Sequence, residues 1–208
     1  MNALMELWAK GGDVMWLLLL SAIAGVVIIV ERMIVYTKVS MGAKKFLVDF
    51  KSHLVQGNVD EAIEICEATP GPVPSLMRAG LMKYQQTKGD MNEVEKAIEA
   101  TAVTELAFLE KNMTMLVTVF TVAPMLGFLG TVTGMISAFD AIAMAGTVEP
   151  TIVASGISEA LITTAAGLLI GIPVNMFYNY FSQRIASIIV SIEESTRDFL
   201  EILKSQGK

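Results

Sequence analysis

Residues 160–183 contain no formal charge, and Glu159 stands directly before them. A helix needs about 20 apolar residues to cross a bilayer, so this run of 24 is long enough. It also carries groups that are costly in hydrocarbon unless they meet another helix or water. These are the hydroxyls of Thr163 and Thr164, a Gly167–Gly171 spacing, Pro173 and Asn175. The run therefore predicts one wall of a polar path through a membrane.

Two further uncharged runs occur, at 14–30 and 112–139, and the first resumes as apolar sequence up to residue 36. Hydrophobic residues make up 53% of the chain and charged residues 17%, whereas soluble domains carry about 25% charged residues. The alternative for each run is a buried helix of a soluble protein. Three such runs favour an all-α integral membrane protein with spans at about 14–36, 112–139 and 160–183 and long cytoplasmic helical extensions.

The distribution of Lys and Arg predicts the orientation. One precedes the first span, ten lie between residues 31 and 111, none lies between 140 and 158, and four follow residue 183. Because short loops rich in Lys and Arg stay inside, we expect the N-terminus and the 140–158 loop to be periplasmic. Region 37–111 and the C-terminus are then cytoplasmic. The net charge of −6 argues against nucleic acid as a partner.

Region 37–111 is predicted to be helical, with breaks at 69–74 and at Gly89-Asp90 and an N-cap at Asn58. From Met91 no breaker occurs before Pro124. This predicts one helix over 91–139, about 73 Å long. Its cytoplasmic part is expected to pack on a continuation of the third span. No internal repeat is visible, so we expect a single domain over 1–208.

The chain carries no pattern typical of an enzyme. The one histidine, His53, is expected on a helix surface, and the one cysteine, Cys66, is expected as a small core residue. A P-loop, a nucleophile elbow and metal-ligand spacings are all absent from the sequence. We therefore predict no catalytic residue, no metal and no cofactor.

The second span carries a stripe of small residues that predicts close packing with another helix. Gly127, Gly130 and Gly134 recur at three- and four-residue steps, and Gly130 and Gly134 form a GxxxG pair. Gly167 and Gly171 form a second such pair on the third span. Close packing alone does not account for the threonines beside these glycines.

Depth indicates where polar groups would meet. Thr131 lies about 12 Å inside the outer end of the second span, and Thr164 about 7 Å inside the start of the third. If they faced each other, the two hydroxyls would form a polar belt. The alternative is that each threonine bonds back to a carbonyl of its own helix. Glu159 lies near the outer interface, so a charge at mid-membrane has to come from a partner, unless water bridges the centre.

Several motifs resemble the MotA/TolQ/ExbB proton channel family, most closely ExbB. They are the segments 126–139 (LGFLGTVTGMISAF) and 156–168 (GISEALITTAAGL), with Ile172-Pro173, Tyr178-Asn179 and Glu31-Arg32. The resemblance covers nearly the whole chain and is strongest over 110–182. Three spans with an outside N-terminus match ExbB and TolQ, whereas the flagellar stator branch has four.

The resemblance implies a pentamer in the bacterial inner membrane, whose second and third helices line a lumen. The lumen would hold the helix of an ExbD-like single-span partner that carries an intramembrane aspartate, and a TonB-like protein would carry the work to outer-membrane transporters. Carried over by motif, the ion-pathway residues are Thr131, Glu159 and Thr164. Helical spacing instead places Thr163 on the face of Glu159, so Thr163 stays a second candidate.

Three functions remain open on the sequence. The first is a proton-channel and motor subunit, with ExbB-like and TolQ-like roles as variants. The second is a non-conducting scaffold for a partner subunit. The third is a self-sufficient transporter, which three spans without an inverted repeat make the weakest of the three.

Overall fold

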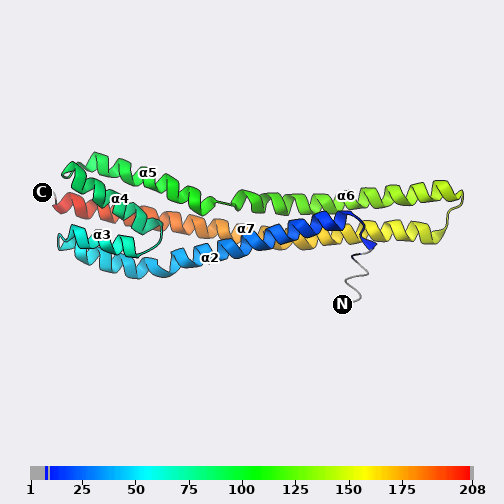
Figure 1. Ribbon diagram of the computed structural model, residues 1–208, viewed down its shortest axis with the longest axis horizontal. Coiled ribbons are helices and arrows are strands. Elements are labelled where there is room, and N and C mark those ends of the chain that lie inside the picture. Colours follow the sequence, from blue (N-terminus) through cyan, green and yellow to red (C-terminus); the bar gives the residue numbers. More distant parts are fainter. Residues whose placement is uncertain (1–7, 9, 207–208) are drawn as a thin grey trace. The chain divides into compact units, whose positions relative to one another are not determined.

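The computed structural model is helical throughout its regular structure (Figure 1). It describes residues 8 and 10–206, with the backbone only for 40–45 and 206. The helices are α2 (Val14–Val55), α3 (Val59–Ala68), α4 (Pro72–Thr87), α5 (Met91–Glu110), α6 (Met113–Ala145) and α7 (Pro150–Gln206). Within the described part of the chain, three helical stretches are long and apolar enough to span a membrane. The all-α membrane fold with three spans is therefore confirmed.

The chain divides into two compact units. The span unit comprises Met1–Glu31 and Asn112–Tyr180, and the bundle unit comprises Arg32–Lys111 and Phe181–Lys208. The chain passes between them at three places, so neither unit is a continuous segment. A single domain over 1–208 stays our proposal for this interleaved arrangement.

The predicted helix over 91–139 is wrong, because the chain breaks between α5 and α6. Asn112 has a φ of 62°, in the left-handed region that asparagine tolerates better than most residues. Its side-chain amide donates a hydrogen bond to Glu31 Oε2 at 2.8 Å. The break thus involves neither proline nor glycine, and a tertiary contact with α2 holds the asparagine in place.

The 140–158 connection between the second and third spans is mostly helical, and only residues 146–149 lie outside α6 and α7. The apolar stretch after Asp140 continues α6 to Ala145, where Gly146 ends the helix at a φ of 67° and donates its N–H to Ile142 O. Pro150 then opens α7, at a position where its missing N–H costs nothing.

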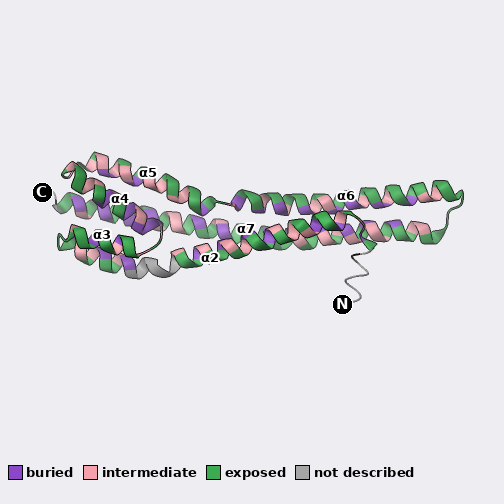
Figure 2. Cartoon of the chain, in the orientation of Figure 1, coloured by how far each residue is buried: buried purple, intermediate pink, exposed green. Residues whose placement is uncertain are grey.

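The bundle unit encloses an apolar core. It is lined by Phe46, Phe50, Leu54, Leu76, Leu81, Val94, Ile98, Ile192, Phe199 and Leu203, among others. The helical stripes expected on α5 and on the end of α7 therefore do meet in one core. In Figure 2 the first turns of α4 are the most continuously buried stretch, in line with burial from Pro72 to Pro74.

The ends of the bundle helices follow the sequence signals with two exceptions. The predicted break at 69–74 is shorter, because α4 begins at Pro72 and proline fits the first turn of a helix. Asp90 caps α5 by accepting a hydrogen bond from Asn92 N. Asn58 holds the N-cap position of α3, but its side chain donates to Glu61 instead of capping the helix.

Cys66 is buried, and desolvation raises the pKa of its thiol to about 12. The thiol is therefore protonated at neutral pH, as suits a core residue.

A buried arginine caps the end of α5. Arg32 is 1% exposed, and its Nη1 donates to the carbonyls of Phe108 (3.2 Å) and Leu109 (3.5 Å). The Tyr36 hydroxyl donates to Leu109 O at 2.8 Å. The last carbonyls of a helix have no partner within the helix. The α2 side chains supply donors to Leu109 O, and Phe108 O accepts from Lys111 N–H at 3.4 Å as well as from Arg32.

We expect Arg32→Leu to lower the stability of the bundle unit by about 1–3 kcal/mol, because it removes a buried, charged hydrogen-bond donor from the carbonyls of Phe108 and Leu109. Thermal unfolding of the detergent-solubilised protein measures the loss. Arg197→Leu is the matched control, since Arg197 is an exposed arginine of α7. Equal effects of the two substitutions would contradict the capping role.

Candidate ion-pathway site

The span unit holds α6 and α7 in backbone contact through small residues. A Cβ atom built on Gly127 would lie 2.8 Å from the carbonyl oxygen of Thr163. One built on Gly167 would lie 2.6 Å from the carbonyl oxygen of Ala123, and one on Gly134 would lie 3.1 Å from that of Gly156. Glycine at these positions is what allows the two helices to approach so closely.

Thr163 is part of this contact. Its side chain is fully buried and fills the space beside Gly130, where an added Cβ would lie 2.5 Å from Thr163 Cβ. Its hydroxyl lies within hydrogen-bond distance of the carbonyls of Glu159 (3.1 Å) and Ala160 (2.9 Å). Within the chain, Thr163 is thus a packing residue with a back-bonded hydroxyl.

Thr131 and Thr164 are both half-buried and have separate acceptors. The Thr164 hydroxyl donates across the helix pair to Gly127 O at 3.4 Å, whereas the Thr131 hydroxyl donates to Phe128 O of its own helix at 2.6 Å. Each oxygen keeps acceptor capacity after donating its proton. The hydroxyls can therefore still accept hydrogen bonds from water or from a partner at the edges of the α6–α7 contact.

Glu159 lies in the first part of α7 and is half-buried. Its Cβ lies near Gly134, and its carboxylate lies against Gly12, where an added Cβ would be 2.5 Å from Glu159 Oε1. Gly12 has a φ of 66°, which favours glycine. Sequence reasoning missed this neighbour, although the Gly11-Gly12 pair ahead of the first span was a visible signal.

The rest of the stripe follows the same helix pair. Gly171 faces Pro124 inside α6, with an added Cβ placed 2.8 Å from Pro124 Cγ. Towards the end of the span, Asn179 Nδ2 donates to Asn175 Oδ1 at 3.5 Å, and both side chains are exposed. The region around the α6–α7 contact thus combines hydroxyls, amides and the Glu159 carboxylate.

The chemical groups of this site are hydroxyls, amides and a carboxylate. Among the described residues, no three His, Cys, Asp or Glu side chains gather as a metal site. Hydroxyl, amide and carboxylate groups on uncharged spans can order water and guide a cation. They define an integral membrane protein with a polar face on its second and third spans.

The chain belongs to the MotA/TolQ/ExbB proton channel family, whose model matches residues 69–194. It is 31% identical over 206 residues to a putative biopolymer transport protein ExbB-like 1 of Synechocystis sp., covering 98% of this chain and 77% of that protein. It is 32% identical to the biopolymer transport protein ExbB of Xanthomonas campestris, over 68% of this chain and 62% of that protein. It is 38% identical to the Tol-Pal system protein TolQ of Haemophilus influenzae, over 58% of this chain and 51% of that protein.

Proposed function

We propose that this chain is the proton-channel subunit of an inner-membrane complex like ExbB–ExbD–TonB, which uses the proton motive force to energise outer-membrane transport. The observation that carries the proposal is the arrangement of Thr131, Glu159 and Thr164. All three are half-buried on α6 and α7, while residues 160–183 hold no ionisable side chain at acidic or neutral pH. A polar route without its own central charge fits a channel that a partner completes.

The missing charge is supplied, in this proposal, by an ExbD-like single-span subunit with an aspartate in its helix. Protons pass through water ordered by the threonine hydroxyls to that carboxylate. The single chain leaves many large apolar side chains exposed, including Trp16, Met125, Phe128 and Leu169, each at 60% or more. Lipid and further copies of the chain would cover them, and we propose a pentamer with a periplasmic N-terminus and a cytoplasmic C-terminus.

Reconstitution into vesicles tests the proposal. Proton flux should appear only when the chain is assembled with its partner, and an Asp→Asn change in the partner helix should abolish it. Flux from the chain alone would indicate a self-sufficient transporter. No flux with or without the partner would indicate a scaffold.

A TolQ-like role in envelope maintenance is the second candidate, because TolQ proteins are among the relatives. Complementation separates the two roles. Restored TonB-dependent uptake in a strain without ExbB supports the first proposal. Restored envelope integrity alone, in a strain without TolQ, supports the second.

Glu159→Gln should weaken partner-dependent flux several-fold and leave membrane insertion intact. A carboxylate near the mouth of the path concentrates cations and orders water, which the amide does less well. Glu149→Gln is the matched control, since Glu149 lies exposed in the 146–149 loop. Wild-type flux in Glu159→Gln vesicles would contradict a role of Glu159 in the ion pathway.

A further inference from the structure

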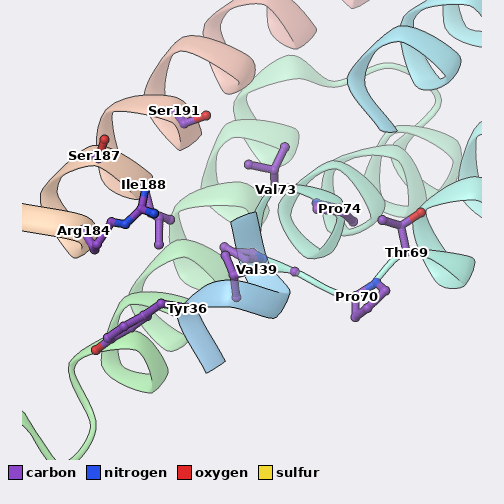
Figure 3. Close-up of a pocket in the computed structure, with 12 residues that line it drawn as sticks. Tyr36, Val39, Thr69, Pro70, Val73, Pro74, Arg184, Ser187, Ile188 and Ser191 are labelled. Carbon is purple, nitrogen blue, oxygen red and sulfur yellow. The ribbon is translucent and has the colours of Figure 1, made fainter. Parts of the chain in front are cut away.

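The bundle unit contains a cavity of about 290 Å³ between α2, the α3–α4 connection and α7. Figure 3 shows its lining: Arg184, Ser187, Ile188 and Ser191 follow one side of α7, and Tyr36 and Val39 come from α2. The segment Thr69–Pro74 closes the remaining side. None of these residues belongs to the ion-pathway site.

The cavity has an apolar floor and a polar rim. Tyr36, Val73 and Pro74 are buried, whereas Arg184 and Ser187 are exposed at the opening. Arg184 carries five N–H donors, so it can bind an anion while keeping a contact within the protein. No Asp or Glu is among the lining residues.

Two neighbouring cavities differ in that each is lined by an acidic as well as a basic side chain. One, of about 580 Å³, shares Val39 and Pro70–Pro72 and is lined by an acid, Glu105, as well as by Lys38. The other, of about 440 Å³, contains Arg78 and Glu67, which form an ion pair at 2.8 Å. The Arg184 cavity therefore combines an anion-attracting group with apolar walls in a way that these two do not.

The cavity has a rigid wall, and its residues lie just beyond the ends of two predicted membrane spans. Pro70 fixes the backbone of the α3–α4 connection, where Gly71 adopts a φ of 147°, and Pro72 and Pro74 fix the first turn of α4. Arg184 is the first charge after the uncharged run 160–183, and Val39 ends the first candidate span. A preformed cavity at this level meets the headgroup layer of a leaflet.

We propose that this cavity binds an anionic phospholipid of the surrounding membrane. The phosphate lies on Arg184 and the Ser187 hydroxyl, and the first part of an acyl chain lies against Tyr36, Val73 and Ile188. The volume admits a headgroup and part of one chain, so the rest of the lipid stays in the bilayer. This inference is independent of proton conduction.

Native mass spectrometry of the protein in neutral detergent tests the site. Phosphatidylglycerol and phosphatidylcholine with identical chains are titrated in parallel, and we expect selective retention of phosphatidylglycerol. Arg184→Gln should weaken that binding about tenfold, as expected for the loss of hydrogen bonds to a charged group. Arg184→Lys should keep most of it. Arg197→Gln, further along α7, and Lys38→Gln, in the neighbouring cavity, should leave it unchanged.

A cavity-filling variant and a competitor distinguish binding inside the cavity from attraction to the protein surface. Ser191→Trp fills the cavity without changing charge and should abolish retention. Wild-type retention in this variant would mean surface attraction alone and would overturn the proposal. Loss in Arg197→Gln or Lys38→Gln equal to that in Arg184→Gln would overturn it as well. Competition by millimolar glycerol 3-phosphate would assign the site to soluble phosphate esters instead of lipid. Circular dichroism confirms folding, and if Arg184→Gln does not fold, Ser191→Trp and the competition experiment decide.

Discussion

Replacing Gly167 with leucine is expected to separate α6 from α7 and to prevent assembly of the protein. The added side chain would begin 2.6 Å from the carbonyl oxygen of Ala123 and 3.1 Å from the Cα atom of Gly127. Both obstacles are backbone atoms, so no rotamer change relieves the collision. Overpacking costs about 1–3 kcal/mol in ordinary cores, and a backbone obstacle places this case at or above the upper end.

Native mass spectrometry and thermal unfolding in detergent measure the two effects of Gly167→Leu. Gly130→Leu should act in the same direction but less severely, because its obstacle is the Thr163 side chain. Ala165→Leu is the matched control, two residues away on α7 and exposed within the chain. An intact oligomer with unchanged thermal stability for Gly167→Leu would show that the two helices can separate locally without loss of the assembly.

The second large effect is expected from the threonines. Thr131→Val and Thr164→Val keep the side-chain shape and remove the hydroxyl, so the protein should fold while proton flux falls roughly tenfold, about 1.4 kcal/mol in the barrier. The double change should cost little beyond the single ones if both hydroxyls serve one water path. Flux is measured in vesicles containing the complex with its partner.

Thr163→Val is the control for this pair. Its hydroxyl is buried and bonded to carbonyls of its own helix, so the change should leave flux near normal. Normal conduction by both Thr131→Val and Thr164→Val, together with loss in Thr163→Val, would contradict the family-based assignment. Helical spacing from Glu159 would then have chosen the right face.

The sequence was sufficient to predict the three spans, because charged side chains are excluded from hydrocarbon and long runs without them can be recognised in the sequence. The bundle core was predictable in outline from the stripe through Val94 and Ile98 and from a break after α3, which was predicted over 69–74 and which the structure limits to 69–71. The break at Asn112 was not, since Lys-Asn within an apolar stripe is compatible with helix. Its left-handed turn depends on tertiary contacts, including the Asn112–Glu31 hydrogen bond.

The candidate site was predictable by residue type but not by orientation. Spacing along one helix places Thr163 near the face of Glu159, yet it does not say which face meets another helix. The structure assigns the buried contact to Thr163 and the edge to Thr164, because Gly130 leaves a space that only one of them fills. Arg32 was visible as a charge after the first span, but its burial depends on an α5 end that the sequence did not predict.

The glycine contact between α6 and α7 also limits how the span unit can move. Where the two backbones are in contact, few side-chain torsions can change to accommodate a movement. A small displacement of α6 against α7 therefore has no alternative low-energy packing. The two helices should therefore move together as one rigid body. Any widening or narrowing of a passage that they line would then arise between neighbouring copies, and slow exchange of amide hydrogens along the contact would be its spectroscopic signature.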